Sequence, residues 1–254
     1  MLIINGCWGN FDEYMIPKII HYCWFGGGKM PSMEVRCMKS WADKLPDYKV
    51  MRWDESTFDV NSTPFTAAAY KAKKYAFVAD YVRLYALLKY GGIYLDTDIE
   101  IVKPFDDLLH YSAFGGFETS EVMQTGVLGV SSANEVMQEF FEVYHHIPYE
   151  VDKQGNNLTP ANSAILAKIL VSHGLKLDNS RQSIGGMEIF PQDYFCPIDQ
   201  ATRQIICTEN TYTIHYLHGS WFSPKLRMIN ATKRFVGKYL GYGVVNFVRR
   251  IVKP

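Results

Sequence analysis

The 254-residue chain lacks an excess of charge of either sign, because 26 Lys and Arg residues balance 26 Asp and Glu residues. Without a strong overall field, nucleic acid is not favoured as a partner. No uninterrupted apolar run reaches the roughly 18 residues that a membrane-spanning helix needs. The first residues also lack the basic and apolar regions of a signal peptide. We therefore expect a cytoplasmic location.

The cysteines give no sign of disulfide cross-links. The five cysteines are odd in number and widely spaced, and none forms a C-x-x-C pair. This pattern excludes a disulfide framework and a zinc-ligand spacing, and it favours reduced thiols. The sequence has neither internal repeats nor low-complexity segments. What it does have is a 48% hydrophobic content, enough for a globular domain with a large core.

Short apolar runs alternate with segments of helical periodicity. Such alternation predicts an α/β fold with a mainly parallel central sheet, whose ligands gather beyond the carboxyl ends of the strands. The expected strands are 19–25, 48–53, 93–102, 126–130, 203–208 and 211–215. The expected helices are 31–43, an interrupted or continuous stretch over 65–90, 134–146 and 163–173.

The strongest chemical signal is the D-x-D motif at Asp96 and Asp98. From Ile93 to Val102 the pattern alternates with a period of two, which predicts a strand with both carboxylates on one face. Neighbouring carboxylates repel, and a hard divalent cation such as Mn²⁺ or Mg²⁺ removes that repulsion. The bound ion can then hold a diphosphate leaving group. The alternative is a solvated acidic face on an edge strand.

Three further signals come with alternatives. Asp80 and Arg83, at i and i+3 on a helix, form either a surface ion pair or a pair facing a polar cleft. A late histidine, His215 or His218, is either structural or completes a carboxylate metal site. Trp24 ends the first strand and is either a core residue or a platform for a nucleobase.

Taken together, these motifs resemble the glycosyltransferases with a D-x-D sugar-binding motif, the glycosyltransferase family 32 type. That group includes bacterial capsular and exopolysaccharide transferases, the yeast initiating α-1,6-mannosyltransferase and, more distantly, the glucosylating domains of clostridial toxins. The resemblance covers residues 16–222 in order. It is carried by the strand Ile16–Gly27, the central block Ala76–Pro104, the segment Ile189–Pro197, and the closing His215-x-x-x-x-Ser220-Trp221.

The resemblance implies a GT-A (Rossmann-like) nucleotide-sugar-binding fold and a retaining, metal-dependent hexosyl transfer to an acceptor hydroxyl. By the same resemblance the donor is a UDP-sugar, and the pathway makes capsular or extracellular polysaccharide. The implied catalytic residues are Asp80, Arg83, Asp96 and Asp98. The implied metal ligands are Asp96, Asp98 and His215, for Mn²⁺ or Mg²⁺. The implied donor-binding residues are Trp24, Phe25, Asp80, Arg83, Tyr94, Asp96, Ser220 and Trp221.

The chain is expected to divide into an N-terminal extension at 1–15, a glycosyltransferase domain at 16–229 and a basic amphipathic tail at 230–254. The tail interleaves basic and aromatic residues, so it either contacts an anionic membrane surface peripherally or packs as a solvated helix. Membrane contact would suit a lipid-linked saccharide acceptor. Two rival functions remain: a D-x-D phosphatase or phosphotransferase, and a non-catalytic nucleotide-sugar-binding protein.

Overall fold

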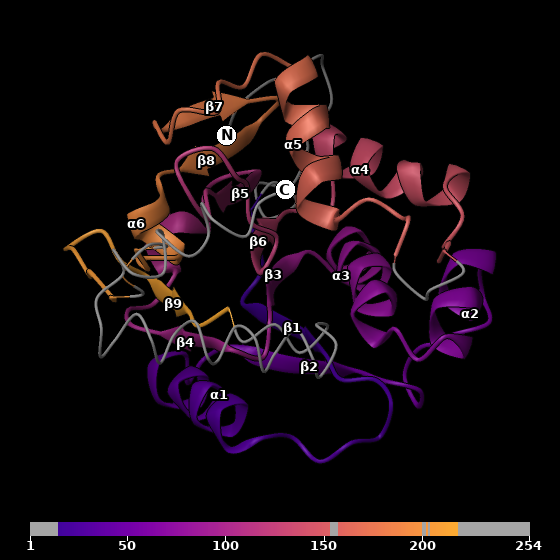
Figure 1. Cartoon of the computed structure of the whole chain (residues 1–254). Coiled ribbons are helices and arrows are strands. Elements are labelled where there is room, and N and C mark those ends of the chain that lie inside the picture. Colours follow the sequence, from indigo (N-terminus) through magenta and orange to yellow (C-terminus); the bar gives the residue numbers. More distant parts are fainter. Residues whose placement is uncertain (1–14, 153–156, 200–201, 203, 218–254) are drawn as a thin grey trace, which may run out of the picture.

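The computed structural model describes residues 15–152, 157–199, 202 and 204–217 (Figure 1). The strands are β1 (Ile19–Cys23), β2 (Lys49–Trp53), β3 (Gly92–Leu95), β4 (Ile99–Ile101), β5 (Ala113–Gly116), β6 (Val127–Val130), β7 (Gln182–Ile184), β8 (Met187–Phe190) and β9 (Thr213–His215). The helices are α1 (Ser32–Lys44), α2 (Pro64–Lys71), α3 (Tyr75–Tyr90), α4 (Glu135–His146), α5 (Asn162–Ser172), α6 (Gln192–Phe195) and the 3₁₀ turn η2 (Asp106–Leu108).

Seven strands form the central sheet, in the order β2-β1-β3-β6-β5-β8-β7. β1 is parallel to β2 and β3, and β5 is parallel to β8, while β6 and β7 are antiparallel to their neighbours. Five of the seven strands therefore run in one direction. The expected α/β class with a mainly parallel central sheet is confirmed, in agreement with the GT-A fold that the resemblance implied.

Helices cover both faces of this sheet. Tyr94 of β3 faces a core built with α3, α4 and α5, whereas its neighbours Ile93 and Leu95 face a second core that includes Trp41 of α1. Figure 1 shows α3, α4 and α5 gathered on one side and α1 on the other. Among the described residues, no helix is both long and apolar enough to cross a membrane.

The helix α3, which carries Asp80 and Arg83, has a defined end. The expected helical stretch over 65–90 is interrupted, because α2 ends at Lys71 and α3 begins at Tyr75. Gly91 follows α3 at a positive φ of 62°, and a Cβ there would lie 2.8 Å from the ring of Pro17. Glycine therefore allows the chain to leave α3 and enter β3 against the segment before β1.

Two strand predictions are wrong. The segment 93–102 is not one strand: β3 ends at Leu95, and β4 resumes at Ile99 in a separate two-stranded sheet with β9. A turn over Asp96–Asp98, in which the Ile99 N–H donates to the Asp96 carbonyl at 3.1 Å, separates the two strands. In the predicted strand 203–208, the described residues form only an isolated bridge between Ile205 and Ile198.

Candidate active site

The D-x-D motif lies in the turn that follows β3, at the carboxyl end of a strand in the middle of the sheet. The Asp96 N–H donates to the Gly126 carbonyl at 2.9 Å, so the turn is tied to the segment leading into β6. Asp96 and Asp98 do not share the face of one strand, as the alternation predicted. The turn at the carboxyl end of β3 brings them together instead.

The chain returns to this turn through β9. In the β4–β9 pair Ile99 lies opposite His215, which brings the histidine to the D-x-D turn (Figure 1). His215 Nε2 lies 3.3 Å from Asp98 Oδ1. One ligand atom from each of Asp96, Asp98 and His215 lies within 4.8 Å of the others. The exposed fractions of these side chains are 28%, 13% and 9%.

This cluster fits a divalent cation in three respects. Two carboxylates and an imidazole are ligands suited to Mn²⁺. The Nδ1 atom of His215 is buried and has no hydrogen-bond partner. Gly126 leaves space beside the cluster, since a Cβ there would lie 2.9 Å from Asp96 Oδ2 and 3.1 Å from His215 Nδ1. Burial lowers the pKa of His215, but the nearby carboxylates of Asp98, Asp96 and Glu118 raise this pKa above its ordinary value overall.

Next to the cluster is a buried ion pair from α3. Arg83 Nη2 lies 2.9 Å from Asp80 Oδ1 and 3.4 Å from Asp96 Oδ1, and its side chain is only 6% exposed. Arg83 Nη1 donates to the Thr125 carbonyl at 2.6 Å. Burial raises the pKa of Asp80 to about 6, against the attraction of Arg83. The pair is therefore not a solvated surface contact, and it links α3 to the D-x-D turn.

Tyr94, in the strand that precedes the turn, contacts the Asp96 carboxylate. Its hydroxyl donates to Asp96 Oδ1 at 3.0 Å, and the Arg83 guanidinium carbon lies 4.5 Å from the centre of its ring. The tyrosine is 2% exposed. Asp96 thus has one oxygen engaged by Tyr94 and Arg83, which leaves Oδ2 on the side of Gly126.

The expected nucleobase residues lie at the end of β1. Trp24 is partly buried, and its indole N–H donates to the Gly28 carbonyl at 2.7 Å, which orders the glycine loop. The ring of Phe25 is buried and packs edge to face on Phe58 with centroids 6.5 Å apart. The structure thus places Phe25 in the core. Ser220, Trp221, His218 and the segments 1–14 and 230–254 lie outside the described residues.

The sequence reasoning missed four residues around this site: Gln124, Thr125, Gly126 and Asn162. Thr125 contributes a backbone carbonyl, Gly126 contributes only space, and Asn162 donates to the Asp80 carbonyl at 3.2 Å. A backbone carbonyl can come from any residue, and a glycine has no side chain that indicates chemistry, so the residue types at 125 and 126 could not have revealed these roles. Gln124 and Asn162 could have been noticed only as polar residues next to predicted buried elements.

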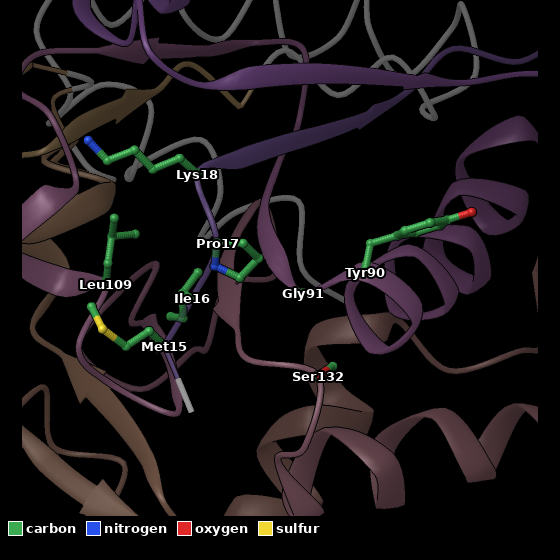
Figure 2. A pocket seen from close by; sticks show the side chains of 8 residues that line it. All are labelled: Met15, Ile16, Pro17, Lys18, Tyr90, Gly91, Leu109 and Ser132. Carbon is green, nitrogen blue, oxygen red and sulfur yellow. The ribbon is translucent and has the colours of Figure 1, made fainter. Parts of the chain in front are cut away.

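Two surface hollows among the described residues lie away from this cluster. One, of about 440 Å³, is lined by Pro17, Tyr90, Gly91, Ser132 and neighbouring residues, as Figure 2 shows. The other is lined by Ser131, Asn134 and the glycines of the β7–β8 turn. Both adjoin the starts of β1, β3, β5 or β8, at the opposite end of the sheet from the D-x-D turn.

Comparison with known proteins shows what the D-x-D region is similar to. Residues 31–114 match the family described as "Glycosyltransferase sugar-binding region containing DXD motif". This range includes Asp80, Arg83, Tyr94, Asp96 and Asp98, so the resemblance to the D-x-D glycosyltransferases is confirmed. The match supports a transferase rather than a D-x-D phosphatase.

Curated relatives agree with this class. The chain is 34% identical over 144 residues to inositol phosphoceramide mannosyltransferase 3 of Schizosaccharomyces pombe, covering 53% of this chain and 40% of that protein. It is 32% identical over 140 residues to mannosyl phosphorylinositol ceramide synthase CSH1 of Saccharomyces cerevisiae, covering 52% and 35%. The matched regions thus span less than half the length of these relatives.

Solved structures superpose on this chain only partly, with TM-scores below 0.5. "PaToxG Glycosyltransferase" superposes with a TM-score of 0.46 and 17% identity, covering 62% of this chain and 70% of that chain. The galactosyltransferase LgtC, in complex with donor and acceptor sugar analogues, gives a TM-score of 0.45 and 11% identity, covering 80% and 88%.

Proposed function

We propose that this protein is a metal-dependent, retaining hexosyltransferase that moves a sugar from a nucleotide diphosphate donor to an acceptor hydroxyl. The observation that carries the proposal is the meeting of Asp96, Asp98 and His215 within 4.8 Å, beside the buried Asp80–Arg83 pair. The match of the D-x-D region to glycosyltransferases supports it independently. We take the donor to be a UDP-sugar.

Asp96, Asp98 and His215 would hold Mn²⁺ or Mg²⁺, which when bound supplies positive charge for the diphosphate of the donor. The three residues offer two anionic ligands and one neutral ligand, and the ion relieves the repulsion between the carboxylates. Ser220 and Trp221 are proposed to contact the phosphates and Trp24 the nucleoside end, while the buried ring of Phe25 would support the Trp24 segment from the core.

The ion pair from α3 is suited to hold the sugar itself. Asp80 can accept hydrogen bonds from sugar hydroxyl groups, and Arg83 fixes both Asp80 and Asp96 in place. Since Arg83 is buried and also bonded to the Thr125 carbonyl, this geometry exists before the donor binds. A prearranged site contributes to rate because its groups need not reorganise during the reaction.

The acceptor and the location are proposed from the relatives and from the basic tail. Two relatives are mannosyltransferases or mannosyl-lipid synthases by name, which suits a lipid-linked saccharide acceptor here. We further propose a role in capsular or extracellular polysaccharide synthesis, at the cytoplasmic face of a membrane that residues 230–254 contact. Removing 230–254 should abolish binding to anionic vesicles, and undiminished binding would refute the membrane contact.

The test of the function is a panel of UDP- and GDP-linked hexoses incubated with Mn²⁺, with Mg²⁺ and with chelator. Metal-dependent release of nucleotide from one donor, with transfer to a sugar acceptor, is the expected result. The anomeric configuration of the product, read by NMR, decides whether transfer is retaining. Binding without turnover would point to a non-catalytic nucleotide-sugar-binding protein, and no binding of any donor would overturn the proposal.

A further inference from the structure

Gln124 is a buried amide without any partner. It is 1% exposed, and neither its Nε2 nor its Oε1 atom has a hydrogen bond. A glutamine amide offers two donors and two acceptor lone pairs. Leaving such a group buried and unsatisfied is costly, and each case in a folded protein needs an explanation. One explanation is a ligand that completes the hydrogen bonds of the Gln124 amide.

The position of Gln124 assigns it to the site. The next residue, Thr125, accepts from Arg83 at 2.6 Å, and Gly126 lies against Asp96 and His215. The Gln124 N–H also donates to the Gly116 carbonyl at 3.0 Å, at the carboxyl end of β5. Gln124 therefore belongs to the short segment 124–126, whose next two residues contact Arg83, Asp96 and His215.

A second incomplete amide lies at the other end of the ion pair. Asn162 is 4% exposed and donates through Nδ2 to the Asp80 carbonyl at 3.2 Å, but its Oδ1 has no partner. Asp80 and Arg83 are therefore flanked by Asn162 on one side and by the Gln124–Thr125 segment on the other. Two unsatisfied amides beside one ion pair indicate that a polar ligand completes this region.

The chemistry of an amide selects the kind of group that it contacts. A phosphate would be matched by cations or several N–H donors, and a nucleobase by an exposed aromatic face. A neutral group that both donates and accepts is matched by a hydroxyl. We propose that Gln124 binds a hydroxyl group of the donor hexose and thereby distinguishes hexoses that differ in the orientation of that hydroxyl. This inference rests on the proposed function.

The decisive variant is Gln124→Met, which keeps the length of the side chain and removes both unsatisfied groups. If Gln124 serves the ligand, the ligand-free variant unfolds at a higher temperature than wild type, because a buried orphan amide is gone. Its affinity for the preferred nucleotide sugar falls about fivefold to tenfold per lost hydroxyl contact. Its preference between epimeric donors shrinks to about twofold or less. A structural residue would lower the unfolding temperature instead.

Two controls accompany this variant. Gln138→Met makes the same change at an exposed position of α4, and it should alter neither quantity. Binding of the free nucleoside diphosphate with Mn²⁺ should be the same in Gln124→Met and in wild type, because that ligand has no sugar.

The outcomes separate the two proposals. Unchanged epimer preference, or a lower unfolding temperature, in Gln124→Met overturns the role of Gln124 alone, provided that wild type binds nucleotide sugars. If wild type binds none, the proposed function and this inference fall together.

Discussion

Gly126→Ala tests the metal site by adding a methyl group beside the ligands, without changing any ligand. The added Cβ would lie 2.7 Å from Cε1 of His215 and 2.9 Å from Oδ2 of Asp96, where ordinary contacts start near 3.4 Å. At least one of these side chains must therefore move by about 0.5 Å or more, whereas metal–ligand distances tolerate only about 0.2 Å. We expect Mn²⁺ affinity to fall about 10- to 100-fold, or about 1.4–2.7 kcal/mol, as for other disturbances around metal ligands.

The assay is a Mn²⁺ titration followed by electron paramagnetic resonance, with circular dichroism to verify the fold. Gly28→Ala is the matched control, because a Cβ at Gly28 meets nothing within 4 Å and its φ is not positive. That variant should bind Mn²⁺ like wild type. Unchanged Mn²⁺ affinity in Gly126→Ala would refute the location of the ion between Asp96 and His215.

The other predictions concern single charges. Asp98→Ala should abolish metal-dependent nucleotide binding and sugar transfer. Asp43→Ala, on an exposed part of α1, should leave both intact. Calorimetry measures the nucleotide binding, and a turnover assay measures the transfer. Burial raises the pKa of Asp80 from 3.8 to about 6, so the folded state binds this proton more tightly than the unfolded state. Between pH 3.8 and about pH 6 the free energy of unfolding should therefore fall as pH rises, by up to about 3 kcal/mol. Urea unfolding of Asp80→Asn should show no such pH dependence. The same pH dependence in the variant and in wild type would contradict the assignment to Asp80.

Local patterns predicted the elements that carry the most regular side-chain periodicity. The strand before Trp24 and the helix carrying Asp80 and Arg83 lie where expected, and β3 begins at Gly92, next to the predicted start of its strand. The prediction failed where alternation continued through a turn. Asp96 and Asp98 alternate with apolar residues as in a strand, but nothing in that pattern reveals that β4 leaves the sheet and pairs with β9.

The composition of the site could be predicted only partly. Carboxylates and the pair Asp80–Arg83 are visible in a sequence because their residue types are costly to bury without a purpose. Choosing His215 over His218 needed the resemblance, and the structure describes His215 alone, opposite Ile99. The space at Gly126 and the carbonyl of Thr125 depend on tertiary contacts with α3 and β9, which no local pattern encodes.

The pairing of β4 with β9 makes the site sensitive to the order in which the chain emerges during synthesis. The D-x-D turn and His215 are separated by more than 100 residues of sequence, yet Ile99 and His215 are direct partners. A nascent chain that ends at α5 contains the residues of the turn and of the ion pair but not His215. Closing so long a loop costs entropy, and an ion that joins both ends offsets part of that cost. Metal binding would then favour chains that have been synthesised at least as far as β9.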